Sequence, residues 1–217
     1  MNKVNGDMYD WIDYTWNPVK GCQHDCKYCY LKSIFNFDMT PRLSQKTLDE
    51  TLKSGSVFVG SSSDMFGEFI PSDWIRKSLN RCDDMFSTYI LQTKNPKRYQ
   101  EFLNYFDKFF VLGTTIESNR LYQISKAPNV NERYSAMRLL AGHTQAKLFI
   151  TIEPVLDFDT SELLDMILCC YPDFVNIGAD SKNHHLPEPS RQKLHLLIKE
   201  LKAVTEVRLK KNLSRLL

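Results

Sequence analysis

Short runs rich in β-branched residues alternate with helical patterns along most of this 217-residue chain. This rhythm is typical of parallel βα units, because a helix usually connects two parallel strands. Right-handed crossovers repeated about six times predict an α/β fold, a partial (β/α)6 TIM-like barrel of mainly parallel strands with helices outside. The expected strands are residues 10–16, Val57–Ser61, Tyr89–Thr93, Phe109–Thr115, Leu148–Glu153, Phe174–Gly178 and Glu206–Leu209.

Helix-start signals and apolar stripes support this fold. Capping side chains or adjacent prolines predict helix starts near Ser72, Asn95, Thr160 and Ser190. Apolar residues at helical spacing then predict three faces packed on the sheet. These faces comprise Trp74, Ile75, Leu79 and Cys82, then Leu163, Leu164, Ile167 and Leu168, then Leu194, Leu197, Ile198 and Leu201. Cys82, Cys169 and Cys170 are expected to be small buried side chains in these helices.

The composition favours one domain spanning residues 1–217, because 42% hydrophobic and 12% aromatic residues can build one good core. The 28 basic and 26 acidic residues nearly balance, so the net charge requires neither nucleic acid nor an anionic membrane as partner. No apolar run approaches the roughly 18 to 20 residues of a membrane-spanning helix. With six cysteines and no signal-peptide pattern, we expect a cytoplasmic protein with reduced thiols.

Three cysteines, Cys22, Cys26 and Cys29, follow the first expected strand in C-x3-C-x2-C spacing. Thiolates select zinc, cuprous copper or iron–sulfur clusters. The other cysteines lie far downstream, so a four-iron cluster held here would keep one iron open to an exogenous ligand. In open α/β sheets, ligand chemistry lies at the carboxyl ends of the strands, which is where this loop begins.

Two other classes of function are open. A zinc site that adds His24 to the three cysteines would place this histidine inside the run of ligands, outside the usual zinc-finger spacings. With zinc, or with an iron–sulfur centre that serves structure or electron transfer, the chain would be a non-catalytic binding module. Nucleic-acid binding without chemistry would rest on the basic tail, residues 208–215, although such a run is more typical of a solvated terminus.

Polar residues follow the expected strands more often than connecting loops require. Because the carboxyl ends of parallel strands meet at one edge, these side chains should face a common mouth. The candidates for this mouth are Ser61, Ser62, Ser63, Asp64, Gln92, Thr93, Lys94, Asn95, Thr114, Thr115, Glu117, Glu153, Asp180 and Ser181.

The cysteine loop resembles that of the radical S-adenosylmethionine (SAM) superfamily, C-x3-C-x-(aromatic)-C, through Cys22, Cys26, Tyr28 and Cys29. The resemblance implies a [4Fe-4S] cluster on the three cysteines and a free iron that chelates the amino and carboxylate groups of SAM. Reduction then cleaves SAM to methionine and a 5′-deoxyadenosyl radical. The resemblance also implies that Tyr28 packs near the adenine, and that a reductant protein such as a flavodoxin or ferredoxin supplies the electron.

From roughly Trp11 to Asp180, the chain resembles uncharacterised phage-associated radical SAM proteins related to the branch that contains spore photoproduct lyase. The shared segments are Thr15–Val19, Ser63–Glu68, Thr93–Pro96 and Ile152–Pro154. The resemblance implies an enzyme whose radical abstracts hydrogen from a substrate, with a nucleobase or nucleotide as the class suggested by family analogy.

The resemblance also assigns roles to the polar candidates. Ser63 and Asp64 fall where many radical SAM enzymes contact the methionine amino group, and Lys94 can pair with the carboxylate through a charge-assisted bond. Contacts to the ribose and carboxylate are expected from Thr93, Thr114 and Thr115. Glu153 is expected to contact SAM or substrate, and Tyr28, Tyr30 and Glu117 complete the expected cofactor-binding set.

One departure concerns the end of the reaction. In the lyase, a cysteine one or two positions ahead of the Ser-Asp pair donates a hydrogen atom, whereas this chain has Ser61 and Ser62. A serine O–H bond is too strong for that role, so repair of a thymine dimer by the lyase route is not expected. Tyr30 or a substrate-derived radical is the alternative.

Overall fold

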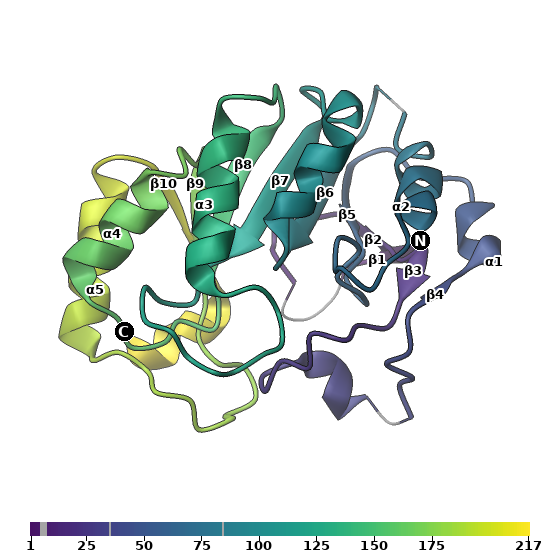
Figure 1. Cartoon of the computed structure of the whole chain (residues 1–217). Coiled ribbons are helices and arrows are strands. Elements are labelled where there is room, and N and C mark those ends of the chain that lie inside the picture. Colours follow the sequence, from purple (N-terminus) through teal and green to yellow (C-terminus); the bar gives the residue numbers. More distant parts are fainter. Residues whose placement is uncertain (5–7, 35, 84) are drawn as a thin grey trace.

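The computed structural model describes residues 1–4, 8–34, 36–83 and 85–217. Its centre is one eight-stranded sheet in the order β1-β2-β5-β6-β7-β8-β9-β10 (Figure 1). Among the described residues of this sheet, β1 and β2 pair antiparallel and all other neighbouring strands pair parallel. The strands are β1 (Asn2–Lys3), β2 (Tyr14–Trp16), β5 (Ser56–Val59), β6 (Thr88–Thr93), β7 (Phe110–Thr115), β8 (Lys147–Ile152), β9 (Phe174–Ile177) and β10 (Glu206–Leu209). This sheet confirms the predicted α/β fold.

The helices lie between successive strands, as the βα rhythm predicts. They are α1 (Gln45–Leu48), α2 (Ser72–Leu79), α3 (Val130–Ala141), α4 (Thr160–Leu168) and α5 (Arg191–Lys202), with 3-10 helices η1 (Tyr30–Ser33), η2 (Pro96–Tyr105) and η3 (Lys211–Leu216). A separate two-stranded ribbon pairs β3 (Val19–Lys20) with β4 (Arg42–Leu43). Within the residues described, no helix is both long enough and apolar enough to cross a bilayer.

Helices begin close to all four predicted starts, but Asn95 does not have the capping role that was expected. Ser190 caps α5, while α2 and α4 begin at Ser72 and Thr160 themselves. Asn95 precedes η2 without capping it, because its side-chain amide donates instead to the Phe66 carbonyl at 3.1 Å.

The start of α3 was not among the expected starts. It carries a capping box in which Asn129 and Glu132 satisfy each other's backbone amides. Its sequence signal is an asparagine followed three residues later by a glutamate.

The expected strand over residues 10–16 is shorter than predicted, since only Tyr14–Trp16 pairs with the sheet. The aromatic residues before it leave the sheet edge and pack across the inner face of the barrel. There Tyr9 stacks on Trp11, with ring centroids 5.5 Å apart, and Trp11 packs edge-on against Phe149 and Phe174. Burial of these rings outweighs the strand preference of an aromatic run.

Each central strand is buried on both faces, as expected for a parallel sheet. Alternate residues point outward to the helices, and the predicted apolar faces of α2, α4 and α5 pack there. Cys82 and Cys170 are buried in this core, although Cys82 follows the end of α2, and Cys169 at the end of α4 is only half-buried.

The inner face of the sheet changes character along the strands. Toward the amino ends it is apolar and forms a second core of Phe58, Ile90, Val111, Phe149 and Phe174, covered by the N-terminal segment. Toward the carboxyl ends the same face turns polar, with Gln92, Thr115, Thr151, Glu153 and Asn176. Apolar side chains therefore fill the half of the barrel at the amino ends of the strands. The polar half at the carboxyl ends can hold a binding site.

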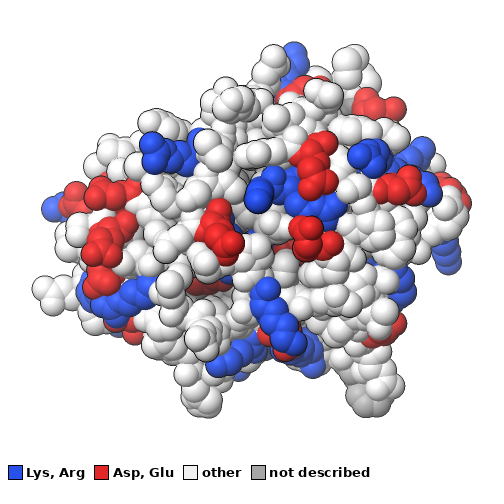
Figure 2. Space-filling view, viewed as in Figure 1, with Lys and Arg blue, Asp and Glu red and all other residues white. Residues whose placement is uncertain are grey.

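Charged side chains of both signs are interspersed over one face of the molecule. Figure 2 shows lysine, arginine, aspartate and glutamate mixed across this face of the molecule. This view agrees with the near balance of basic and acidic residues in the chain.

Gly113 provides a test of the inner core. A Cβ at this position on β7 would lie 2.3 Å from the ring of Phe149, which is fully buried and stacked on Phe174. We expect Gly113→Ala to lower the free energy of unfolding by about 1 to 3 kcal/mol, measured by urea denaturation. Gly142→Ala is the control, because a Cβ there meets nothing within 4 Å. Equal stability of the two variants would contradict this packing.

Candidate active site

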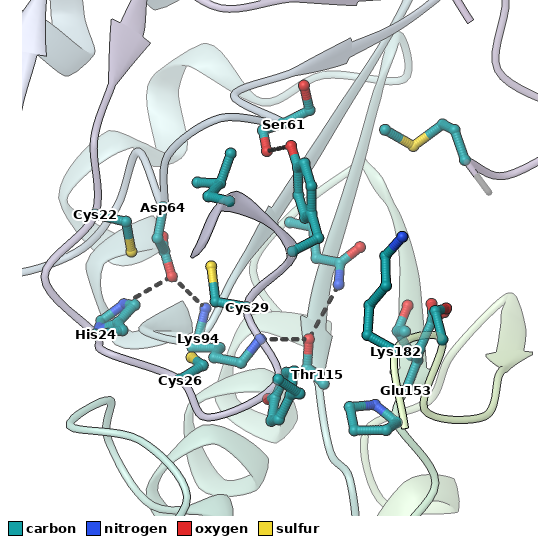
Figure 3. Close-up of a pocket in the computed structure, with 18 of the residues that line it drawn as sticks. Cys22, His24, Cys26, Cys29, Ser61, Asp64, Lys94, Thr115, Glu153 and Lys182 are labelled. Carbon is teal, nitrogen blue, oxygen red and sulfur yellow. Dashed lines mark hydrogen bonds and ion pairs between the residues drawn. The ribbon is translucent and has the colours of Figure 1, made fainter. Parts of the chain in front are cut away.

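A cavity of about 560 Å³ lies at the carboxyl ends of the strands. Cys22, Cys26 and Cys29 line one side, and Glu153 and Lys182 line the opposite side (Figure 3). All three cysteines are free thiols on the loop that follows β3, here called the cysteine loop (residues 21–30). The predicted metal ligands thus face one common cavity.

The protein environment favours the neutral form of two of these thiols, Cys22 and Cys26. Burial, with a further contribution from the charge of Asp64, raises the pKa of the Cys22 thiol to about 12. Burial also raises the pKa of Cys26. Metal binding by these groups must therefore displace protons. Within the described residues, no three His, Cys, Asp or Glu side chains are grouped closely enough for a single metal ion.

Asp64 ties one side of the cysteine loop to the sheet. Its carboxylate is 8% exposed and lies 2.8 Å from His24 Nε2. It also accepts the Thr93 hydroxyl at 2.5 Å and the Lys94 backbone amide at 2.7 Å. Burial alone would raise the pKa of Asp64, but the bonds from His24, Thr93 and Lys94 lower it, so the group is ionised.

Glu117 and Arg133 hold the other side of the cysteine loop. Both are buried, and Arg133 Nη1 donates to Glu117 Oε2 at 2.8 Å. The Tyr28 hydroxyl donates to the other oxygen of the same carboxylate. Backbone bonds from Lys27 to Ile124 and from residue 126 to residue 24 complete this attachment. The loop is therefore clamped between β5–β6 and the segment that leads into α3.

The start of the cysteine loop depends on a glycine. Gly21 has φ +84°, and a Cβ there would lie 2.2 Å from the Thr40 carbonyl oxygen. Its own carbonyl accepts the Ser63 hydroxyl at 2.7 Å. Further along, the Tyr30 hydroxyl donates to the Ser61 carbonyl at 2.6 Å. Both contacts join the loop to the turn after β5.

A chain of hydrogen bonds forms the floor of the cavity. Lys94 Nζ lies 3.4 Å from the Thr115 hydroxyl, which also accepts Gln92 Nε2 at 3.0 Å. The Tyr9 hydroxyl lies 2.9 Å from both Gln92 Oε1 and Thr151 Oγ1. Burial, followed by the nearby Glu153 charge, raises the pKa of Tyr9, so this phenol is neutral.

The C-terminal segment contributes to the opposite wall. Lys210 Nζ bonds both oxygens of Glu153, at 2.7 and 2.9 Å, and Asn212 Nδ2 reaches the same carboxylate at 3.2 Å. Arg215 donates to the Asp180 carbonyl and pairs with Glu188. Lys210 departs from the expected solvated basic terminus, because its charge is paired with Glu153, whereas Arg215 stays exposed while it pairs with Glu188.

Most predicted site residues line the cavity, and two lie beside it. The lining residues are Cys22, Cys26, Tyr28, Cys29, Tyr30, Ser63, Asp64, Thr93, Lys94, Thr115 and Glu153. Thr114 points to the other face of β7, where its hydroxyl donates to the Thr93 carbonyl at 2.6 Å. Glu117 is 2% exposed and engaged with Tyr28 and Arg133. The roles of all these residues stay predictions.

Of the further mouth candidates, Ser61, Gln92, Asp180 and Ser181 line the cavity, and Ser62 and Asn95 do not. Several other lining residues were absent from the predicted site, namely Tyr9, Thr151, Lys182, His184 and Lys210. Thr151 could have been found from the strand period of two, because it lies two residues before the inward-facing Glu153. Tyr9 and Lys210 carry no local signal, since long chain separations divide them from their partners Gln92 and Glu153.

The sequence matches a model of one protein family. The family is described as protein of unknown function (DUF5131), and the match covers residues 7–196, so the chain belongs to this family. Among curated proteins, none matches the sequence.

Solved structures share the fold at low sequence identity. A point mutant of spore photoproduct lyase aligns with a TM-score of 0.64 and 15% identity, over 94% of this chain and 65% of the lyase chain. A double mutant of that enzyme with bound AdoMet and dinucleoside spore photoproduct aligns at 0.63 with 14% identity, over 92% and 64%. Streptococcus suis SuiB bound to S-adenosylmethionine aligns at 0.58 with 11% identity, over 90% and 49%.

These alignments confirm the predicted relation to the radical SAM superfamily at the level of fold. The chain has the partial TIM-like barrel of these enzymes. It spans less than two thirds of the length of the lyase structures that it matches.

Asp64 provides a test of the clamp on the cysteine loop. We expect Asp64→Asn to lower the free energy of unfolding by about 3 kcal/mol, because the ionised carboxylate accepts three buried hydrogen bonds and the single oxygen of an amide cannot replace them all. Urea denaturation measures the change. Asp25→Asn in the same loop is the control, since this carboxylate is exposed and should leave the midpoint unchanged. A harmless Asp64→Asn would refute the role of the carboxylate as an anchor.

Proposed function

We propose that this member of the DUF5131 family is a radical SAM enzyme that binds a [4Fe-4S] cluster through Cys22, Cys26 and Cys29. When bound and reduced, the cluster would supply one electron to the SAM sulfonium, so that the S–C5′ bond breaks to give methionine and a 5′-deoxyadenosyl radical. That radical would take a hydrogen atom from a substrate in the same cavity. The observation that carries the proposal is the convergence of three free thiols on one cavity of this fold.

The donor set supports a cluster more than a single zinc ion. A mononuclear site would need a fourth ligand, and the nearest candidate by sequence, His24, uses Nε2 to bond Asp64. Three thiols without a fourth donor suit a cluster that keeps one metal position open.

The groups around the thiols suit SAM. Lys94 has no carboxylate partner among the described residues, so its amine is available for the methionine carboxylate. Its Nζ lies 5.3 Å from the centroid of the Tyr28 ring, which supplies an aromatic wall for the adenine. Asp64 fixes the Lys94 backbone, and the Thr93 and Thr115 hydroxyls lie in the same wall.

The substrate, electron donor and compartment extend the same proposal. A substrate of the nucleobase or nucleotide class is suggested by the lyase, one structure of which holds a dinucleoside spore photoproduct. A flavodoxin or ferredoxin in the cytoplasm would deliver the electron. Ser61 and Ser62 stand where the lyase branch has its hydrogen-donating cysteine, so we expect a different final hydrogen transfer from that of the lyase.

The central prediction concerns the three thiols. Anaerobically reconstituted protein should hold about four irons per chain and form 5′-deoxyadenosine from SAM and dithionite. Changing Cys22, Cys26 or Cys29 to Ala should remove the cluster absorbance and the product together. Cys169→Ser is the control, because this half-buried thiol at the end of α4 lies outside the cavity. Iron without 5′-deoxyadenosine, or zinc without iron, would favour the binding module instead.

A second prediction concerns the SAM carboxylate. Lys94→Met removes the cavity amine while keeping most of the side-chain volume, so we expect the KM for SAM to rise about tenfold. The measurement is the rate of 5′-deoxyadenosine formation against SAM concentration. Lys97→Met, an exposed lysine one turn further along, should leave KM unchanged. If the KM for SAM is the same in Lys94→Met and in the parent protein, Lys94 does not bind SAM.

A further inference from the structure

Each carboxylate that lines the cavity bonds a basic side chain, whereas two lysines that line it bond no carboxylate in the described part of the chain. Its three carboxylates each bond a basic side chain, in the pairs Asp64–His24, Asp180–His184 and Glu153–Lys210. Lys94 and Lys182 also line the cavity, and neither has a carboxylate within ion-pair distance among the residues that the structure describes. The cavity therefore holds two amines without anionic partners.

SAM can satisfy one of these two amines. Lys94 stands beside Tyr28 on the side of the cysteines, where the proposed function places the methionine carboxylate. Lys182 extends from the loop after β9 on the side opposite the cysteines (Figure 3). SAM carries a single carboxylate, so it leaves the second amine without a counter-charge.

The base of Lys182 is held firmly, while its amine is free. Its backbone amide donates to Asp180 Oδ1 at 3.2 Å, and the Asp180 carbonyl accepts from Arg215 at 3.0 Å. The neighbouring Ser181 hydroxyl accepts from Asn212 at 2.7 Å. The C-terminal helix η3 thus fixes the loop, which lowers the entropy that Lys182 would lose on binding a ligand.

We propose that Lys182 binds an anionic group of the substrate, a phosphate or a carboxylate, at the wall of the cavity opposite the cysteines. The proposal rests on the proposed function, because that function assigns Lys94 to SAM. A substrate anchored at Lys182 would reach across the cavity toward the cysteines, with its reactive C–H bond between the two anchors.

A chemical footprint of Lys182 tests the proposal on the holo-protein with SAM and without reductant. Acetic anhydride acetylates exposed lysines, and mass spectrometry gives the rate at each one. Inorganic phosphate and malonate are the probes, each compared with chloride at equal ionic strength. Lys202, an exposed residue of α5, is the internal reference. We expect phosphate, malonate or both to slow acetylation of Lys182 several-fold and saturably, with no effect on Lys202.

The pattern of protection also identifies the anion. Protection by phosphate alone indicates a substrate with a phosphate group, and protection by malonate alone indicates a substrate with a carboxylate. Protection by both anions indicates a site that binds phosphate and carboxylate alike. Equal acetylation of Lys182 in phosphate, malonate and chloride overturns the proposal.

Variants give an independent measure. In calorimetric titrations with the protecting anion, Lys182→Gln should weaken binding about tenfold, whereas Lys182→Arg keeps the charge and should retain it. Lys202→Gln makes the same change in net charge and should bind like the parent. Unchanged binding by Lys182→Gln would refute the site.

Failure of this inference and failure of the proposed function are distinguishable. Anion binding is measured without reductant, and 5′-deoxyadenosine formation is measured separately on the parent protein. Product without protection of Lys182 refutes the anion site alone. Protection without product refutes the radical chemistry.

Discussion

The buried carboxylate of Asp64 is the contact on which the candidate site depends. It joins three segments through His24 of the cysteine loop and through Thr93 and Lys94 at the end of β6, while remaining part of the turn after β5. Each bond is charge-assisted and shielded from water, so each is stronger than a comparable surface contact. Without this group, the loop that carries the three thiols would lose its link to the end of β6 and keep its attachments to Glu117 and to the turn after β5.

The second constraint is the division of the inner face of the sheet. Its apolar half is filled by the N-terminal segment, so ligands have access only to the polar half, at the carboxyl ends of the strands. Tyr9 lies at the boundary, with its ring against Phe58 and its hydroxyl on Gln92 and Thr151. Gly178 leaves space for the side chain of Glu153, because a Cβ at position 178 would lie 2.8 Å from the Glu153 carboxyl group.

Sequence patterns predicted the elements well because those patterns are local. Every expected strand is present, and the position of the cysteines after the first expected strand placed them at the correct end of the sheet. The strand period could also have separated Thr115, which faces the cavity, from Thr114, which faces away. No local pattern could assign Glu117 to Arg133, because that pairing depends on how α3 packs against the sheet.

The contacts of the C-terminal segment could not be predicted from the sequence. As a sequence, Lys210 to Arg215 is a run of charges near a terminus, and such runs are usually solvated. In the fold, Lys210 supplies the cation beside Glu153, while Asn212 and Arg215 hold the loop that carries Lys182. The half-buried Glu153 carboxylate therefore takes its basic partner from the connection between the last strand and the last helix. The site is therefore built from both ends of the chain, with Tyr9 forming its floor and Lys210 part of its far wall.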